Sequence, residues 1–181
     1  AQGHGLNQVT DALYNNYEDG DPRRAASIST GYKDRTGNWI ETKFENKWYD
    51  PNYVKNGSYY YGNNFIVYRY ADVLLMYAEA THNPVYLNQV RSRVGLPGYG
   101  ELGYPSDKYP SFALAIEHER NVELALEFHR WLDLKRTGRA TVVLSAAKGK
   151  NIANDMLVMP IPLIEIQNNP ALTQNPYYSS K

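Results

Sequence analysis

The chain of 181 residues contains no cysteine, which excludes disulfide bonds, thiolate metal sites and a thiol nucleophile. It also has no apolar run of about 18 residues, the length that a membrane-spanning helix needs. Its 19 basic and 19 acidic residues give no net charge, so no long-range field draws the protein toward a polyanion or an anionic membrane. Nucleic acid is therefore not an expected partner.

Tyrosine is the abundant aromatic residue, with 17 Tyr against 3 Trp and 4 Phe. A Tyr ring has an apolar face and a polar edge, which suits contact with a hydrated ligand such as a sugar. It equally suits half-buried positions in a loop-rich fold. The hydrophobic content of 43% is enough for a core in a chain of this length.

Hydrophobic periodicity predicts a mostly α fold: helix pairs with long irregular loops and at most a short β-hairpin. The expected helices are residues 6–17, residues 65–80 with most of the circumference buried, a helix between Pro84 and Gly95, one kinked helix or two consecutive helices from Ser111 to near Gly138, and residues 163–167. Residues 23–65 are expected to be loop, apart from one hairpin around the turn signal at 34–38. Residues 156–161 suit a short strand.

Three carboxylates, Glu119, Glu123 and Glu127, recur at four-residue spacing on the expected long helix. A glycosidase needs two carboxyl groups on either side of a glycosidic bond, whereas these face the same way. The chain also lacks a Gly-x-Ser-x-Gly nucleophile motif. We therefore expect no catalysis.

His129 and Asp133 share the same spacing and are the candidates for a metal pair. Arg120, Arg130 and Arg136 lie close enough in the sequence to neutralise the acidic row. Ion pairing is thus the expected role of these charges. We expect no bound zinc and no other cofactor.

Five stretches, in this order, carry a family resemblance. They are Asp21-Pro22-Arg23, RYADVLLMYAEA at 69–80, Leu87 to Arg91 with Arg93 and Gly95, the ER, EL, E, RW, DL, R and G positions within 119–138, and the PIP, EI, NP and QNP positions within 160–176. They resemble the C-terminal part of SusD/RagB-type outer-membrane glycan-binding lipoproteins. Two positions depart from the family pattern, because Phe128 and Tyr177 stand where the family often has Gly.

The resemblance implies that residues 1–181 form a single C-terminal domain of a longer protein, whose N-terminal helical-repeat part, similar to tetratricopeptide repeats, is absent here. It implies a surface-exposed lipoprotein of the outer membrane, held by a lipid anchor on that absent part. The implied activity is non-catalytic binding of oligosaccharide or polysaccharide, with delivery to a SusC-like TonB-dependent transporter. The alternative is a supporting region that stabilises the repeat part and the transporter contact without touching glycan.

The positions expected to contact sugar are Trp39, Trp48, Tyr49, Tyr53 and Tyr60, because flat rings stack on the C–H faces of pyranoses. A core role for the two Trp residues remains open.

Overall fold

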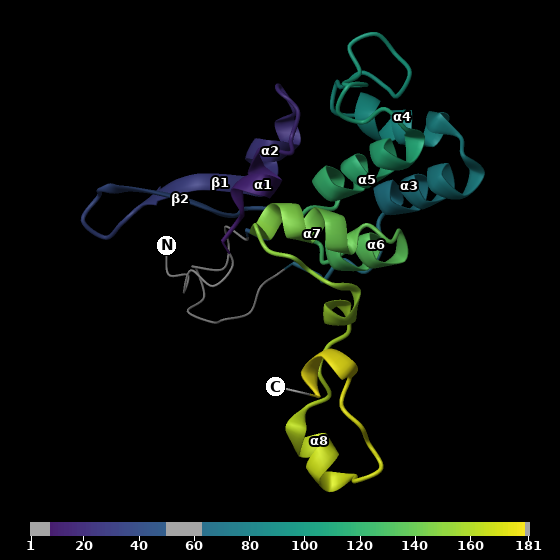
Figure 1. Ribbon diagram of the computed structural model, residues 1–181. Coiled ribbons are helices and arrows are strands. Elements are labelled where there is room, and N and C mark those ends of the chain that lie inside the picture. The colour runs from purple at the N-terminus through teal and green to yellow at the C-terminus, as the bar shows by residue number, and fades with distance from the viewer. Residues whose placement is uncertain (1–7, 50–62, 180–181) are drawn as a thin grey trace. The chain divides into compact units, whose positions relative to one another are not determined.

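The computed structural model describes residues 8–49 and 63–179. The chain forms two compact units, Ala1–Arg130 and Trp131–Lys181. As expected, helices dominate, and the sheet in the described residues is a single antiparallel pair (Figure 1). Within the described ranges, no helix has the length and apolar character needed to cross a membrane.

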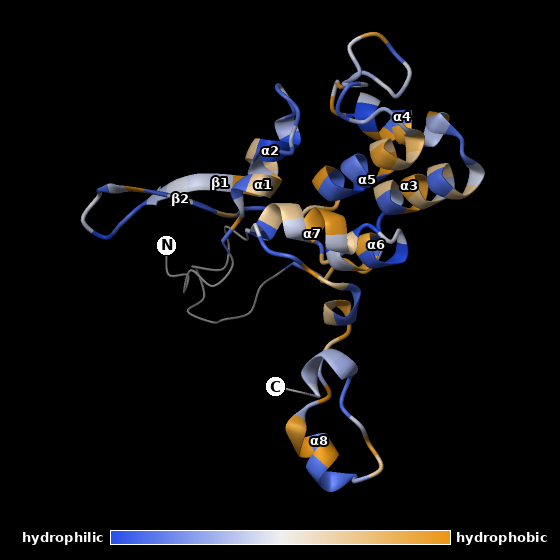
Figure 2. Ribbon diagram, viewed as in Figure 1, coloured by the Kyte–Doolittle hydropathy of each residue, from blue (hydrophilic) through white to orange (hydrophobic). Residues whose placement is uncertain are grey.

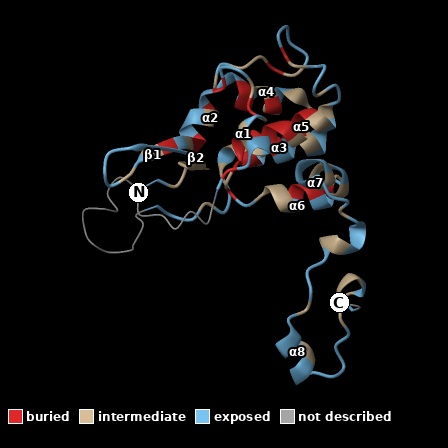
Figure 3. Ribbon diagram, turned by 60° about the vertical axis from the view of Figure 1, so that its left-hand side comes forward, coloured by how far each residue is buried: buried red, intermediate tan, exposed pale blue. Residues whose placement is uncertain are grey.

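The first unit contains α1 (Asp11–Tyr14), α2 (Pro22–Ser27), β1 (Ile28–Lys33), β2 (Trp39–Glu45), α3 (Tyr70–Thr81), α4 (Pro84–Ser92) and α5 (Phe112–Glu123). Helices α3, α4 and α5 pack against one another, and buried residues gather on all three (Figure 3). Leu75, Leu87 and Ile116 lie in the core between them. A second cluster, which includes Tyr17, Ile28 and Val122, joins α5 to the N-terminal segment and β1.

The predicted hairpin is confirmed. Strand β1 pairs antiparallel with β2, and Lys33 opposes Trp39 at the turn. The side chain of Asp34 organises this turn, because its Oδ1 accepts hydrogen bonds from the backbone N–H of Thr36 (2.8 Å) and Asn38 (2.9 Å).

The N-terminal prediction is partly wrong. Helix α1 is shorter than expected, and Val9 donates its N–H to Lys43 O beside β2 instead of joining a helix. Helix α2 lies where a loop is expected. Asp21 caps it by accepting from Arg23 N at 2.9 Å, and Pro22 occupies the first turn, so the Asp-Pro pair marks a helix start.

Helix α3 is less buried than its sequence predicts. Leu75 and Ala78 face the core, but Tyr70 (74%) and Tyr77 (51%) are exposed, together with Val73. Apart from the contact between the rings of Tyr77 and Tyr86, the second apolar side of α3 therefore has little cover among the described residues of its unit.

The long charged segment forms two consecutive helices, which is one of the two expected outcomes. The first helix begins at Ser111 as predicted, and Ser111 caps it, since its Oγ accepts from Leu114 N at 3.3 Å. Helix α5 runs unbroken through the polar residues 117–121 and ends at Glu123, and α6 (Arg130–Arg136) follows. The break falls at a turn over 124–128, where Leu126 (φ 66°) and Phe128 (φ 67°) adopt left-handed conformations.

The second unit holds the rest of α6, then α7 (Ala140–Lys148), η2 (Asn154–Leu157), α8 (Leu163–Asn168) and η3 (Pro176–Tyr178). Hydrophobic residues spread along α7, which is additional to the expected helices (Figure 2). Helix α8 matches the predicted short helix.

The strand predicted at 156–161 is wrong. The backbone of Ile161 pairs with one side chain and not with a neighbouring strand: Ile161 N donates to Gln174 Oε1 at 2.9 Å, and Gln174 Nε2 donates to Ile161 O at 2.8 Å. Asn175 Nδ2 likewise donates to Met159 O. The Gln-Asn-Pro stretch of the sequence therefore holds the Pro-Ile-Pro stretch by side-chain hydrogen bonds.

Candidate functional site

The row Glu119, Glu123 and Glu127 is buried. Buried carboxylates require cations and hydrogen-bond donors, because the loss of hydration of an unpaired charge costs several kcal/mol. The prediction that the row forms ion pairs is confirmed, but its cations come from segments other than those expected. Arg120 pairs with Asp72 (2.7 Å), Arg130 with Glu117 (3.3 Å) and Arg136 with Asp133 (3.0 Å).

Glu119 is enclosed by two arginines from α2 and α4. Its Oε1 accepts from Arg23 Nη1 at 2.5 Å, and its Oε2 accepts from Arg91 Nη1 at 3.0 Å. Arg23 also pairs with Asp21 at 2.8 Å, and Arg91 with Glu18 at 2.7 Å. Helices α2, α4 and α5 thus meet around one carboxylate.

Glu123 and Glu127 bind the segment that follows β2 and the segment that precedes α3. Glu123 accepts from Arg69 at 2.6 Å and from Arg93 at 2.7 Å. Glu127 accepts from Arg69 Nε at 2.8 Å and pairs with Lys47. The residues before α3 and after β2 are therefore both fixed to the end of α5.

The charges of this buried ion network balance. Its cations are Arg23, Lys47, Arg69, Arg91 and Arg93, and its carboxylates are Glu18, Asp21, Glu119, Glu123 and Glu127. Burial alone would raise the pKa of Glu18, but hydrogen bonds with His118 and Arg91 hold it at about 2. Burial also opposes ionisation of Glu123, and the arginines Arg23 and Arg69 outweigh it and lower that pKa.

Within the described residues, no group of three or more His, Asp or Glu is arranged to hold a metal ion. His129 and Asp133, the candidates from the sequence, do not belong to such a group. The acidic row is committed to its arginines and to Lys47.

Beside the network, three rings from distant parts of the chain form a stack, which we call the aromatic row. The ring centroids of Trp48 and Phe65 lie 6.1 Å apart with planes 15° apart, and those of Phe65 and Phe128 lie 5.9 Å apart with planes 25° apart. Phe65 is 66% exposed and Phe128 is 70% exposed. Most of the surface of these two rings therefore faces solvent.

The turn at 124–128 places the aromatic row. Lys47 Nζ donates to the carbonyl oxygens of Glu123 (2.8 Å) and Ala125 (3.1 Å), and Trp48 Nε1 donates to Leu126 O at 2.9 Å. These bonds satisfy carbonyl groups left open where α5 ends. A left-handed backbone at a bulky residue costs about 1–2 kcal/mol, so the conformation of Phe128 is held at a cost.

The expected sugar-contact residues do not all lie together. Trp48 is half-buried in the aromatic row, and Tyr49 beside it is 65% exposed. Trp39 is 59% exposed and begins β2, so the length of the strand separates it from Trp48; its ring lies over Gly31, where a Cβ atom would overlap it. Tyr53 and Tyr60 lie outside the described residues.

Phe65 and Phe128 were not among the sugar-contact residues expected from the sequence. A signal for Phe128 was present, because it is an aromatic residue at a position where the resembled family often has Gly. Its left-handed φ of 67° is a conformation that Gly adopts without strain. Phe65 offers no comparable sequence signal.

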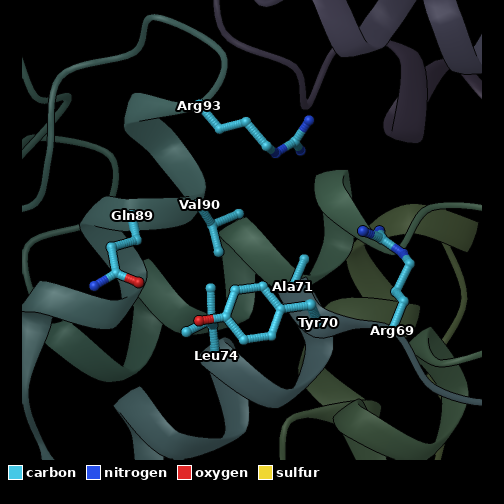
Figure 4. Close-up of a pocket in the computed structure, with 7 residues that line it drawn as sticks. All are labelled: Arg69, Tyr70, Ala71, Leu74, Gln89, Val90 and Arg93. Carbon is cyan, nitrogen blue, oxygen red and sulfur yellow. The ribbon is translucent and has the colours of Figure 1, made fainter.

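A pocket of about 530 Å³ lies between α3 and α4 (Figure 4). Its floor is apolar, formed by Ala71, Leu74 and Val90, and the guanidinium groups of Arg69 and Arg93 stand at its rim. Both arginines are already paired with Glu123. The pocket therefore suits an apolar group better than an anion.

Comparison with known proteins identifies the family of the chain. A sequence model of the SusD family matches residues 6–178. The chain belongs to the SusD family. It is 33% identical to SusD-like protein P38 of Formosa agariphila over 129 residues, which cover 64% of this chain and 25% of that protein.

Two solved structures extend the match to the fold. A laminarin-binding SusD-like protein is 32% identical with a TM-score of 0.71, over 94% of this chain and 38% of the other. Surface glycan-binding protein A from Bacteroides thetaiotaomicron, in complex with laminarihexaose, is 26% identical with a TM-score of 0.71, over 93% of this chain and 41% of the other. This SusD-family chain therefore spans less than half the length of these relatives.

Replacement of Glu119 tests the role of the buried ion network. Glu119→Ala leaves Arg23 and Arg91 buried with one carboxylate fewer, and we expect the free energy of unfolding to fall by about 3–5 kcal/mol. Urea denaturation of the complete protein measures the change. The control is Lys43→Ala, which removes an exposed pair with Asp11 and should leave stability nearly unchanged. Equal effects of the two substitutions would contradict a structural role for the network.

Proposed function

We propose that this SusD-family chain is the C-terminal part of a lipoprotein on the outer-membrane surface that binds oligosaccharide and delivers it to a SusC-like TonB-dependent transporter. The absent N-terminal part would carry the helical repeats and the lipid anchor. The single observation that carries the proposal is the likeness to laminarin-binding proteins of the same family over nearly the whole chain. These relatives support glycan binding, and the rings that this chain exposes support the proposed site.

The side chains of the first unit support binding without catalysis. The buried carboxylates are occupied by cations, and their pKa values that shift are lowered and not raised toward neutrality, as a general acid would require. Exposed rings, in contrast, can stack on the apolar faces of sugar rings while water and polar side chains contact the hydroxyl groups.

Substitution of Trp48 and of Trp39 tests the proposed contacts. We expect Trp48→Ala to lower the affinity of the complete protein for laminarihexaose by about tenfold, the loss that corresponds to about 1.4 kcal/mol of stacking. Trp48→Phe keeps a ring and should lose less. Trp39→Ala tests the other end of β2 separately. Isothermal titration calorimetry measures all three, and unchanged affinity in both alanine variants would remove both residues from the site.

The exposed side of α3 supports the second candidate, a supporting region without glycan contact. Tyr70, Val73 and Tyr77 are exposed on a helix whose opposite side is core, and the pocket of Figure 4 adjoins it. Monomeric proteins rarely leave such a surface open. Because the matched relatives are more than twice as long, the remainder of the protein is the proposed cover.

A charge placed on this side of α3 distinguishes a covered surface from an open one. In the complete protein, Tyr77→Asp should lower the melting temperature by several degrees if the N-terminal part packs there, because a carboxylate would be buried without a partner. Glu79→Asp, on the same helix, keeps its charge and serves as the control. An unchanged melting temperature for Tyr77→Asp would show that the surface stays open.

A further inference from the structure

The aromatic row combines exposure with backbone strain. Phe128 holds a left-handed conformation (φ 67°) while its side chain is 70% exposed, so the ring adds little to the core. His82 and Leu126 are the other non-glycine residues with positive φ among those described. His82 ends α3, where a left-handed residue is ordinary, and Leu126 packs against the second core cluster. Packing therefore accounts for Leu126 and helix termination for His82, whereas neither accounts for a large exposed ring at 128.

The position of Phe128 is set by bonds that do not involve its own ring. Lys47 and Trp48 fix the carbonyl groups of the turn, and this fixes where the ring of Phe128 projects and brings it against Phe65. Glycine would satisfy the same backbone at no cost in strain. A glycine at this position would lack the ring, so the exposed ring is what Phe128 contributes.

The surroundings of the aromatic row suit an amphipathic ligand. Tyr49 and Asn63 are exposed beside the stack, and Asn63 Nδ2 donates to Trp48 O at 3.1 Å. Flat apolar faces with polar side chains at their edge match a sugar, which has C–H faces and hydroxyl groups around its rim. The row has two successive ring separations of about 6 Å, so more than one sugar ring can lie along it.

The charged groups near the aromatic row provide no net attraction for an acidic ligand. Lys47, Arg69 and Arg93 are near the stack in sequence or space, but each is paired with Glu123 or Glu127. Because the buried ion network balances, it offers no net positive field to a carboxylate sugar.

We propose that Trp48, Phe65 and Phe128 form a stacking platform for an uncharged oligosaccharide, with Phe128 held in a strained conformation so that its ring extends the platform. This rests on the proposed glycan-binding function and names the subsite within it. Phe128 is a binding residue, and the turn at 124–128 positions it.

Phe128→Gly separates binding from stability. The variant removes the ring and relieves the strained backbone, so affinity should fall by about three- to tenfold, the effect of one lost aromatic contact, while the melting temperature stays the same or rises. His82→Gly is the matched control: it relieves a left-handed residue and removes an aromatic ring at the end of α3, and affinity should not change. The complete protein is titrated calorimetrically with laminarihexaose, cellohexaose, maltohexaose and, as the acidic comparison, hexagalacturonic acid.

Each outcome decides a different part of the proposal. Weaker binding of a neutral hexasaccharide by Phe128→Gly, with stability kept and His82→Gly unaffected, supports the platform. Unchanged affinity overturns the platform and leaves the proposed function intact. Unchanged affinity with a lower melting temperature overturns it in favour of the remainder of the protein covering these rings. Binding of the acidic hexasaccharide alone overturns the neutral-ligand assignment, and binding of none of the four by the wild-type protein overturns both the function and the platform.

Discussion

The burial of Glu119, Glu123 and Glu127 constrains the rest of the first unit. Three carboxylates in the interior require cations, and this chain supplies them from α2, from the segment after β2, from the start of α3 and from α4. Such a network adds little net stability compared with apolar packing, because desolvation offsets the attraction between charges. The network instead restricts where these segments can pack, because another placement would leave a charge buried without a partner.

The same constraint reaches the surface. Lys47 pairs with Glu127 and donates to carbonyl groups at the end of α5, so the residue next to it, Trp48, lies against the turn that carries Phe128. A purely internal feature thereby fixes the geometry of exposed rings. Rigid placement matters for a binding surface, because a ring that is already ordered loses less entropy when a ligand arrives.

Sequence patterns were sufficient where local rules decide the structure. The turn at Asp34, the Ser111 cap and the core side of α3 each follow from a few adjacent residues. They were insufficient where distant residues decide it. Arg120 is adjacent to Glu119 in sequence, yet it pairs with Asp72, while Arg23 and Arg91 pair with Glu119 across long loops. The strand expected at 156–161 failed for the same reason, since Gln174 satisfies the backbone of Ile161. The aromatic row was only partly predictable from the sequence. Trp48 was expected to contact sugar, but its stacking with Phe65 and Phe128 depends on contacts between residues far apart in the chain.

In the proposed arrangement, the buried ion network holds the aromatic row in place, and glycan binds on its exposed rings. Hydrogen exchange of the complete protein, followed by mass spectrometry with and without saturating laminarihexaose, measures which segments the bound ligand protects. We expect slower amide exchange on ligand addition in peptides that contain residues 46–49, 63–66 and 124–129, with little change at the hairpin turn 34–38. Binding that leaves those three peptides unchanged and protects residues elsewhere would contradict this arrangement.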